Sequence, residues 1–288
     1  MNTNIRKQPG FRKNTSLGER MKTYEEVTTN TSLVPRLPIY VRIDGRSFHT
    51  FCRGLKKPFD MDFVNTMKET TRYLVEKTNA MVGYVQSDEI SLVYQDDSKI
   101  PFETRLFKLQ SVLASMATSA FILNGLKTSL KDRIEKMYPS FDCRVLNLPN
   151  QNEAANMILF RERDCVKNSI TLVALSKFSD KQLYKKNGNE KIEMLKEVGV
   201  DYYKDIPYDL QRGSYFRREV YQKILTPEEI ERIPENQRRY DENGNIVVTR
   251  SHVIQFNLGS PLENIENKAG VLFNKEEAII KGETENEG

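Results

Sequence analysis

The sequence has no tryptophan, only two histidines and only three cysteines among its 288 residues. Cys52, Cys143 and Cys165 form no CxxC pair, and His49 and His252 form no HxxxH pair. This scarcity argues against a zinc site and against a disulfide framework. It also leaves little room for acid–base catalysis by histidine. If the chain is an enzyme, we expect carboxylates and metal ions to carry the chemistry.

Long apolar runs are also missing. No run approaches the roughly 20 residues that a membrane span requires, and the first residues, MNTNIRKQPGFRKN, lack the apolar core of a signal peptide. Hydrophobic residues make up 38% of the chain and charged residues 29%, which is usual for a globular protein. We therefore expect a cytoplasmic protein that does not contact a membrane.

Charge is unevenly distributed, although the net charge is only +4. Residues 1–22 contain six Lys or Arg and one Glu, whereas residues 275–288 contain two Lys and five Glu. Any single basic cluster is explained by a solvated surface, but together they fit a protein that holds phosphates. We expect a flexible basic N-terminal arm (1–20), a catalytic domain (21–225), a β-rich C-terminal extension (226–275) and a disordered acidic tail (276–288).

The first third of the chain reads as strand, helix, strand, strand. An alternating apolar run predicts a strand at 39–43, and helical periodicity predicts a helix ending near residue 78. Apolar runs at 81–85 and 90–94 flank a short polar segment and predict a β-hairpin. Further elements are predicted as helices at 101–124, 150–176 and 189–199 and as strands at 141–148, 213–224, 245–250 and 252–258. The expected fold class is α+β, an antiparallel sheet like that of polymerase palms and nucleotidyl cyclases, with a β-α-β-β core, flanking helices and a β-rich C-terminal part.

Three carboxylates stand where these strands end or turn. Asp44 and Gly45 close the first strand, and Asp88 and Glu89 occupy the hairpin tip. If the first strand lies beside the hairpin, Asp44 and Asp88 reach one edge of the sheet and repel each other unless a cation lies between them. Two Mg²⁺ ions would relieve that repulsion and support phosphoryl or nucleotidyl transfer. Two unrelated turns explain the same residues, and spacing alone does not separate these interpretations.

Five motifs carry a closer resemblance, in the order VRIDGRSFHTF (41–51), KKPFD (56–60), YVQSDEISLVY (84–94), FDCRVLNLP (141–149) and RERDCVKNSI (161–170). The chain resembles the tRNA(His) guanylyltransferase family from about residue 18 to 220. Residues 187–216 look like the bacterial and phage-type branch of that family. Members add nucleotides to the 5′ end of tRNA and so extend it 3′-to-5′.

The resemblance implies a specific set of site residues. Asp44, the Gly45 carbonyl and Asp88 would bind two Mg²⁺ ions, with Asp44, Asp88 and Glu89 as the catalytic carboxylates. The nucleotide pocket would be lined by Asp44, Gly45, Arg46, Ser47, Phe48, His49, Ser87 and Asp88. Four cations match positions that hold triphosphates: Lys57, Arg105, Lys108 and Arg161. Solvated surface lysines and an ion pair of Arg161 within its own helix are the plain alternatives for these cations.

The implied reaction activates a 5′-monophosphorylated tRNA with ATP or GTP and then adds a nucleotide, typically G, from a nucleoside triphosphate. Family members form tetramers that share a tRNA, so a homotetramer is expected. Two other functions stay open: a nucleotidyl cyclase on the same palm, and a non-catalytic tRNA-binding protein. A cyclase would make its product from a nucleoside triphosphate without RNA. The intact Asp44, Asp88 and Glu89 argue against the non-catalytic protein.

One departure from the family pattern bears on the choice of RNA. Eukaryotic members carry His-Ile-Asn-Asn where this chain has Val166, Lys167, Asn168 and Ser169. A valine cannot make the hydrogen bonds of an imidazole, and in those enzymes the histidine motif is associated with selecting tRNA(His). We therefore predict template-directed repair of 5′-truncated tRNAs rather than obligate addition of G to tRNA(His).

Overall fold

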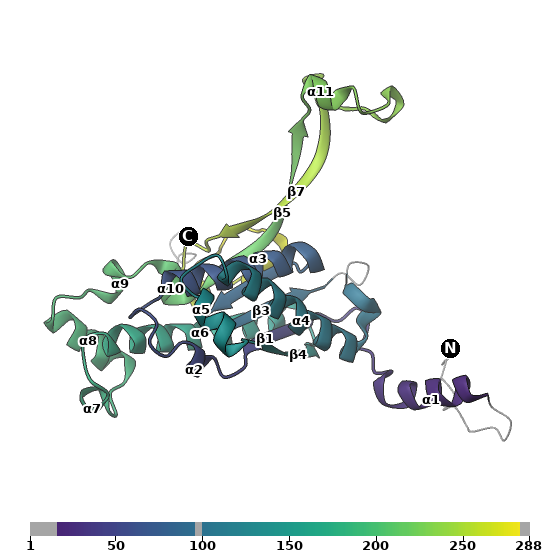
Figure 1. The fold of residues 1–288 in the computed structure, drawn as a ribbon. Helices are drawn as coiled ribbons and strands as arrows, with labels where there is room; N and C mark the ends of the chain where they lie inside the picture. The colour runs from purple at the N-terminus through teal and green to yellow at the C-terminus, as the bar shows by residue number, and fades with distance from the viewer. Residues whose placement is uncertain (1–15, 96–99, 283–288) are drawn as a thin grey trace.

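The computed structural model describes residues 16–95 and 100–282 (Figure 1). Residues 1–15 of the predicted basic arm and 283–288 of the predicted acidic tail lie outside this part. In chain order the helices and strands are α1 (Leu17–Thr29), β1 (Ile39–Gly45), α2 (Phe48–Phe51), α3 (Met61–Thr78), β2 (Val82–Gln86), β3 (Glu89–Tyr94), α4 (Leu106–Gly125), α5 (Lys131–Met137), β4 (Phe141–Asn147), α6 (Gln151–Leu175), α7 (Asp180–Leu183), α8 (Gly188–Glu197), α9 (Tyr202–Asp205), α10 (Tyr208–Arg212), β5 (Ser214–Ile224), α11 (Pro227–Ile230), β6 (Arg239–Tyr240) and β7 (Ile246–Phe256). Short helical turns lie at Pro101–Thr104, Glu235–Gln237, Leu262–Asn264 and Gly270–Asn274.

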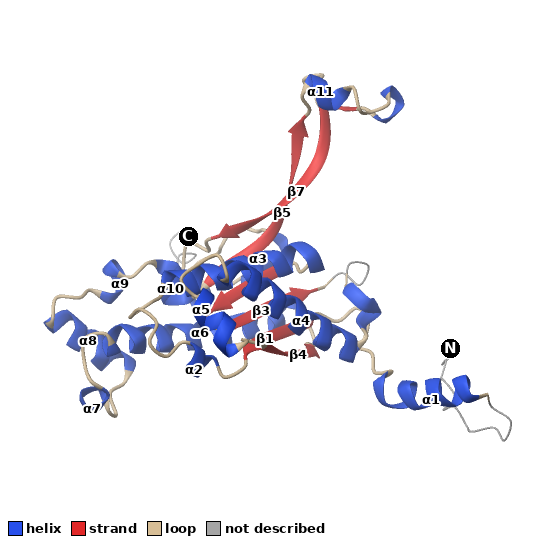
Figure 2. Cartoon of the chain, viewed as in Figure 1, coloured by secondary structure: helices blue, strands red, loops and turns tan. Residues whose placement is uncertain are grey.

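The strands form one seven-stranded antiparallel sheet in the order β4-β1-β3-β2-β5-β7-β6 (Figure 2). Strand β1 lies between β4 and β3, so the predicted neighbour relation of the first strand and the hairpin is confirmed. The β-α-β-β order of β1, α3, β2 and β3 is that of the predicted palm-like α+β fold, and this prediction is also confirmed.

Alternation along the strands separates two apolar layers on opposite faces of the sheet. On one face, Ile39, Val41 and Ile43 of β1 pack with buried residues of α3 and α4. On the other face, Tyr40 of β1 packs with residues of α6 and of the segment 257–282. Asp44 shares the face of Tyr40, because residues two apart point the same way. The predicted carboxylate therefore faces the side of the sheet that α6 covers.

Helix α4 has a mean hydropathy of 1.5 and is the one helix, among the described residues, long and apolar enough to cross a membrane by length and composition alone. The sequence was expected to contain no such stretch, so this expectation was wrong. Every third or fourth residue of α4 is buried in the core between α3 and the sheet, namely Leu109, Leu113, Ala117 and Phe121.

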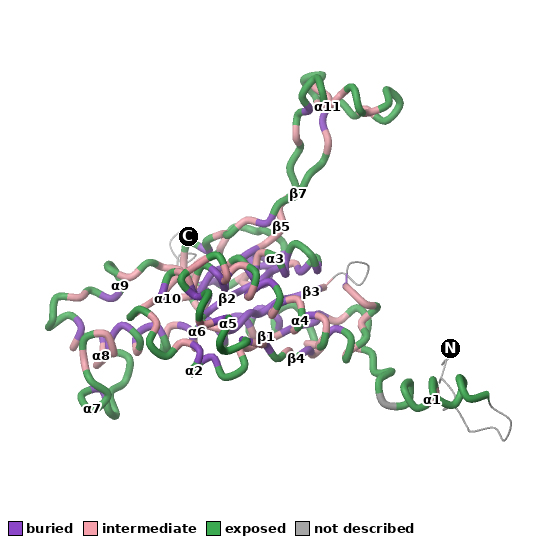
Figure 3. Tube along the Cα trace, viewed as in Figure 1, coloured by how far each residue is buried: buried purple, intermediate pink, exposed green. Residues whose placement is uncertain are grey.

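Strands β5 and β7 continue past the sheet body as a long two-stranded arm (Figure 1), paired from Tyr215–Phe256 to Ile224–Val247. Most of the arm's length is exposed or half-buried (Figure 3). The sequence predicted two strands at 245–250 and 252–258, whereas the structure has the single strand β7. The polar run Arg250, Ser251 and His252 stays extended because its partner strand, rather than a core, holds it.

The C-terminal segment after β7 forms no further strand of the sheet within the described residues. Residues 257–282 cross the face that α6 covers, where Leu258, Leu262 and Ile265 are buried. Residue 225, the predicted end of the catalytic domain, lies just past β5 near the tip of the arm. The helix predicted to start at Asn189 is capped instead by the Asn187 side chain, which accepts from the Glu190 N–H.

Candidate active site

The end of β1 places Asp44 in a row of acidic side chains. Asp44 lies directly opposite Glu89 of β3 on one side and Asp142 of β4 on the other. Directly paired residues of an antiparallel sheet point to the same face with Cβ atoms about 5 Å apart. Asp142 was not among the predicted site residues. Asp142 is the second residue of the predicted strand FDCRVLNL. That position points to the site only once the pairing of this strand with β1 is known.

Asp88 joins Asp44 through the backbone. It sits in the turn between β2 and β3, where Ser87 has a φ of 48°, and its carbonyl accepts a hydrogen bond from the Gly45 N–H at 3.1 Å. This bond ties the end of β1 to the hairpin tip. Burial raises the pKa of the Asp88 carboxyl, and the nearby Asp44 charge raises it further. Asp44 and Asp88 are thus close enough to repel, as the sequence pattern predicted.

Gly45 is required for a reason the sequence did not indicate. A Cβ at this position would lie 2.4 Å from the ring of Phe48, which is 1% exposed. Phe48 packs against Phe51, Phe121 and Phe141 in an aromatic cluster under the turn, with the rings tilted or edge to face. The Phe48 side chain therefore lies in the core. Only the backbone of Phe48 could line the nucleotide pocket, as the resemblance implied for this residue. Of its neighbours in the predicted stretch, three are exposed beside Asp44: Arg46, Ser47 and His49.

An ion-pair chain runs from α6 to Asp44. Arg161 binds Glu89 through two hydrogen bonds of 2.5 and 2.7 Å, and its other terminal nitrogen lies 3.1 Å from Asp164. Glu89 lies 3.4 Å from Arg42, which donates to Asp44 at 3.2 Å. The Arg161 and Glu89 side chains are 10% and 6% exposed. Burial raises the pKa of Glu89, and Arg161 opposes that rise.

The ion pairs of Arg161 with Glu89 and Asp164 bear on the role that Arg161 can have. The family resemblance implied that Arg161 holds a triphosphate, but in the structure its guanidinium pairs with two carboxylates of the protein, Glu89 and Asp164. A charge-assisted, two-point contact of this kind fixes the orientation of Glu89. The role of Arg161 in holding a triphosphate stays a prediction. The role of Arg42 could not be derived from the sequence, because it depends on which strands flank β1.

The remaining predicted cations divide into two groups. Lys57 lines a cavity that Ser87 also lines. Arg105 and Lys108 lie at the other end of the sheet, because Arg105 bridges to Ser32 near the first residue of β1. The six steps from Ile39 to Gly45 span about 20 Å at ~3.3 Å per residue. Arg105 and Lys108 are therefore not brought to Asp44 within one chain.

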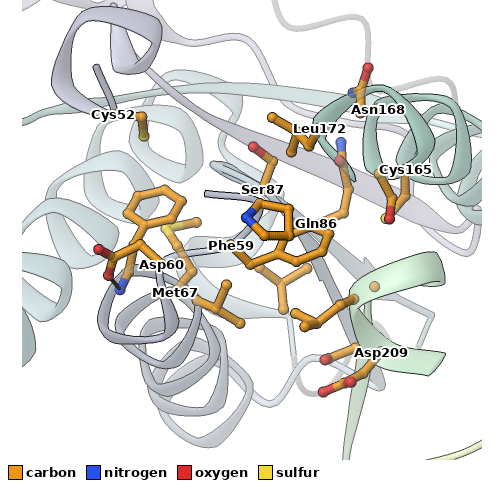
Figure 4. A pocket seen from close by; sticks show the side chains of 18 of the residues that line it. Cys52, Phe59, Asp60, Met67, Gln86, Ser87, Cys165, Asn168, Leu172 and Asp209 are labelled. Atoms are coloured by element: carbon orange, nitrogen blue, oxygen red, sulfur yellow. Dashed lines mark hydrogen bonds between the residues drawn. The ribbon is translucent and has the colours of Figure 1, made fainter. Parts of the chain in front are cut away.

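The cavity beside the hairpin tip has a volume of about 210 Å³ and lies between α3, α6 and α10 (Figure 4). Its lining is mostly apolar, with Phe59, Met67 and Leu172 among the contributing side chains. The rim carries the exposed Lys57, and Lys68 is paired with Asp209 of α10 at 2.5 Å. A mostly apolar pocket with a few polar groups next to acidic and basic side chains is the usual form of a small-ligand site.

Asp44 and Asp88 fit a magnesium site by their chemistry. They supply hard oxygen ligands, and burial together with the Asp44 charge raises the pKa of Asp88, so a bound cation would stabilise its ionised form. Across residues 16–95 and 100–282 no three His, Cys, Asp or Glu side chains converge on one point. Mg²⁺ is commonly held by one or two carboxylates together with water and substrate phosphates. The described residues match that pattern rather than a closed protein cage.

The raised pKa of Asp88 leads to a stability prediction. Between its ordinary pKa, about 4, and the raised value, the folded state binds more protons than the unfolded state, so stability falls as pH rises. At pH 7 without metal, the ionised Asp88 is therefore destabilising. We expect Asp88→Asn to unfold at a higher temperature than the unmodified protein in EDTA, measured by differential scanning fluorimetry. The gain should shrink toward pH 3. A lower midpoint for the variant at pH 7 would contradict the assignment.

The chain is similar to known proteins both in sequence and in fold. The family model described as tRNAHis guanylyltransferase matches residues 18–149, which contain β1 to β4 and the whole acidic row. A solved bacterial tRNA(His) guanylyltransferase-like protein in complex with ATP is 37% identical, with 71% of this chain and 87% of that chain covered and a TM-score of 0.63. A similar bacterial protein in complex with GTP is 31% identical, with 84% and 91% covered and a TM-score of 0.59.

A curated relative supports the same conclusion. The tRNA(His) guanylyltransferase of Schizosaccharomyces pombe is 34% identical over 155 residues, which cover 53% of this chain and 57% of the relative. Enzymes of this kind are generally magnesium-dependent, in agreement with the carboxylate pair. The resemblance seen in the five sequence motifs is confirmed. The chain belongs to the tRNA(His) guanylyltransferase family of nucleotidyltransferases.

Proposed function

We propose that this protein activates the 5′ end of a tRNA with ATP or GTP and extends that end by template-directed addition of nucleotides. The observation that carries the proposal is the meeting of Asp44 and Asp88 beside the cavity that Lys57 and Ser87 line. Relatives in complex with ATP and with GTP support a nucleotide as the occupant of that cavity. The tRNA follows from the family.

The first step joins a nucleotide to the RNA end. An oxygen of the tRNA 5′-monophosphate attacks the α-phosphorus of ATP, the bond between the α-phosphorus and the bridging oxygen breaks, and pyrophosphate leaves. The product carries a 5′-5′ phosphoanhydride. Lys57 is placed to hold the triphosphate as negative charge moves onto pyrophosphate. Arg46, exposed beside Asp44, supplies a second cation at the same edge.

The second step adds the new nucleotide. The 3′-hydroxyl of an incoming nucleoside triphosphate attacks the activated phosphorus of the tRNA, its proton passes to water, and AMP leaves. When bound, magnesium would lower the pKa of the attacking hydroxyl and offset charge on the phosphates. We propose two ions, held by Asp44, Asp88 and the Gly45 carbonyl. Glu89, fixed by Arg161 and Arg42, contributes negative charge behind Asp44.

Homotetramer formation in the cytoplasm is also part of the proposal. Val220, Tyr221 and Ile224 are exposed on the arm, and a lone two-stranded hairpin gains little stability from its own contacts. Contact with other copies would cover these side chains. For the predicted basic arm, we propose sequence-independent contacts with tRNA phosphates.

The test of template direction uses 5′-monophosphorylated tRNAs that lack their first nucleotide, as a matched series. The series varies the anticodon and, separately, the base opposite the gap. Val166 is half-buried against the apolar cluster of α6, α8 and α9 and offers no hydrogen bond. We therefore expect the base opposite the gap to choose the added nucleotide, whatever the anticodon. Addition confined to the histidine anticodon, or of G against every template base, would contradict the proposal.

A further inference from the structure

Gln86 is a buried polar side chain whose bonding is incomplete. It is the last residue of β2, it is 6% exposed, and it lines the cavity. Its Oε1 has no hydrogen-bond partner in the part of the chain that the structure describes. Such an atom is costly unless something else binds it.

The other buried polar side chains of the cavity wall differ in this respect. Each has a partner in the protein: Asp60 accepts from the backbone N–H groups of Lys56 and Phe63, Ser169 accepts from the Tyr202 hydroxyl, and Ser214 accepts from Gln255. Among these four side chains, only Gln86 has a polar atom without a partner among the residues that the structure describes, so it is the one available to a bound ligand. Figure 4 shows it near the middle of the wall, between Phe59 and the α6 residues Leu172 and Asn168.

The surroundings of Gln86 suit a flat ring with a polar edge. Phe59, Met67 and Leu172 supply apolar walls, and Ser87 connects the cavity directly to Asp88, where phosphates would lie. A nucleotide bound with its phosphates at that edge would direct its base into the cavity. A base at Gln86 and phosphates at Asp88 could belong to one nucleotide, because Gln86 and Asp88 are two residues apart across the hairpin turn.

We propose that the Gln86 carboxamide reads the polar edge of the purine base of the activating nucleotide. This inference rests on the proposed function and names the residue that sets its base specificity. A carboxamide places a donor beside an acceptor. It can accept from the adenine amino group while donating to a ring nitrogen. Turned over, it can accept from guanine N1–H while donating to O6. Gln86 would therefore accept ATP and GTP but not a purine without a group at C6.

The experiment compares dissociation constants of ATP, GTP and purine riboside triphosphate, measured by calorimetry on the full chain with Mg²⁺ and without tRNA. For the unmodified protein we expect ATP and GTP each to bind about 10- to 100-fold more tightly than the analogue. In Gln86→Met, a variant of similar length, ATP and GTP should weaken to the level of the analogue. Gln237→Met, which changes an exposed glutamine in the turn Glu235–Gln237 outside the cavity, should keep the original ratios.

A second variant tests the direction of the effect. A carboxylate only accepts, so Gln86→Glu should favour guanine, whose N1–H and amino group both donate. A switch to GTP by this variant would support the assignment. An unmodified protein that binds the analogue as well as ATP, or a Gln86→Met variant that keeps the original ratios, would overturn it. If the protein transfers nucleotides to tRNA but binds the analogue as tightly as ATP and GTP, only this inference is refuted. If it binds no nucleotide at all, the proposed function is refuted as well.

Discussion

Replacing either Asp44 or Asp88 with Asn is expected to reduce nucleotide transfer to tRNA by roughly a thousandfold while the protein stays folded. Losing a carboxylate of the pair removes several kcal/mol of charge stabilisation from both steps, and about 1.4 kcal/mol corresponds to a factor of ten in rate. Both steps should fail together, because both use the same carboxylates. The measurement is the single-turnover rate of each step with a 5′-labelled tRNA.

The control for this prediction is Asp180→Asn, an exposed carboxylate at the start of α7. It removes the same charge far from the acidic row and should leave both rates within about twofold of the original. Asp88→Asn should also be the more stable protein in EDTA, as argued from its raised pKa. Activity lost together with stability would mean that the substitution damages the fold and not the metal pair.

Arg161→Met is expected to destabilise the fold by about 3 kcal/mol, because it strands the buried Glu89 carboxylate. Arg42 still lies 3.4 Å from Glu89, so the cost should fall at the lower end of the range for a broken buried pair. Adding Glu89→Gln should restore most of the lost stability, since no unpaired charge then remains. The measurement is the free energy of unfolding in urea for both single variants and the double variant.

The same variants separate the two roles considered for Arg161. If Arg161 acts through Glu89, the nucleotide dissociation constant should change little in Arg161→Met, and the two substitutions should be strongly non-additive in stability. If Arg161 holds a triphosphate, nucleotide affinity should fall whatever stands at position 89. Additive losses in stability together with a weakened nucleotide affinity would contradict the ion-pair chain.

The core of the palm was predictable because its signals are local. The alternation of apolar and polar residues predicted β1, and a short polar segment between two apolar runs predicted the β2–β3 hairpin. Once Asp44 ended one strand and Asp88 sat in a hairpin turn, only the antiparallel pairing of β1 with β3 was needed to bring them together. The resemblance to a known family then named the chemistry that this juxtaposition supports.

Other features depend on long-range placement that no local pattern encodes. Arg105 and Lys108 start a helix that runs the length of the sheet, and its direction decides which end they reach. The pairing of Arg161 with Glu89 requires α6 to cross that face of the sheet. The unmatched Oε1 of Gln86 becomes visible only when every neighbour on the cavity wall has been accounted for.

The most direct test of the whole account is product analysis with radiolabelled GTP and ATP, Mg²⁺ and the unmodified protein, with and without a 5′-monophosphorylated tRNA lacking its first nucleotide. The account predicts that label enters the 5′ end of the RNA, opposite the templating base, and that neither Asp44→Asn nor Asp88→Asn supports this. It also predicts no product from nucleotides alone. A cyclic nucleotide formed without RNA, or an RNA end left unchanged by the unmodified protein, would contradict it.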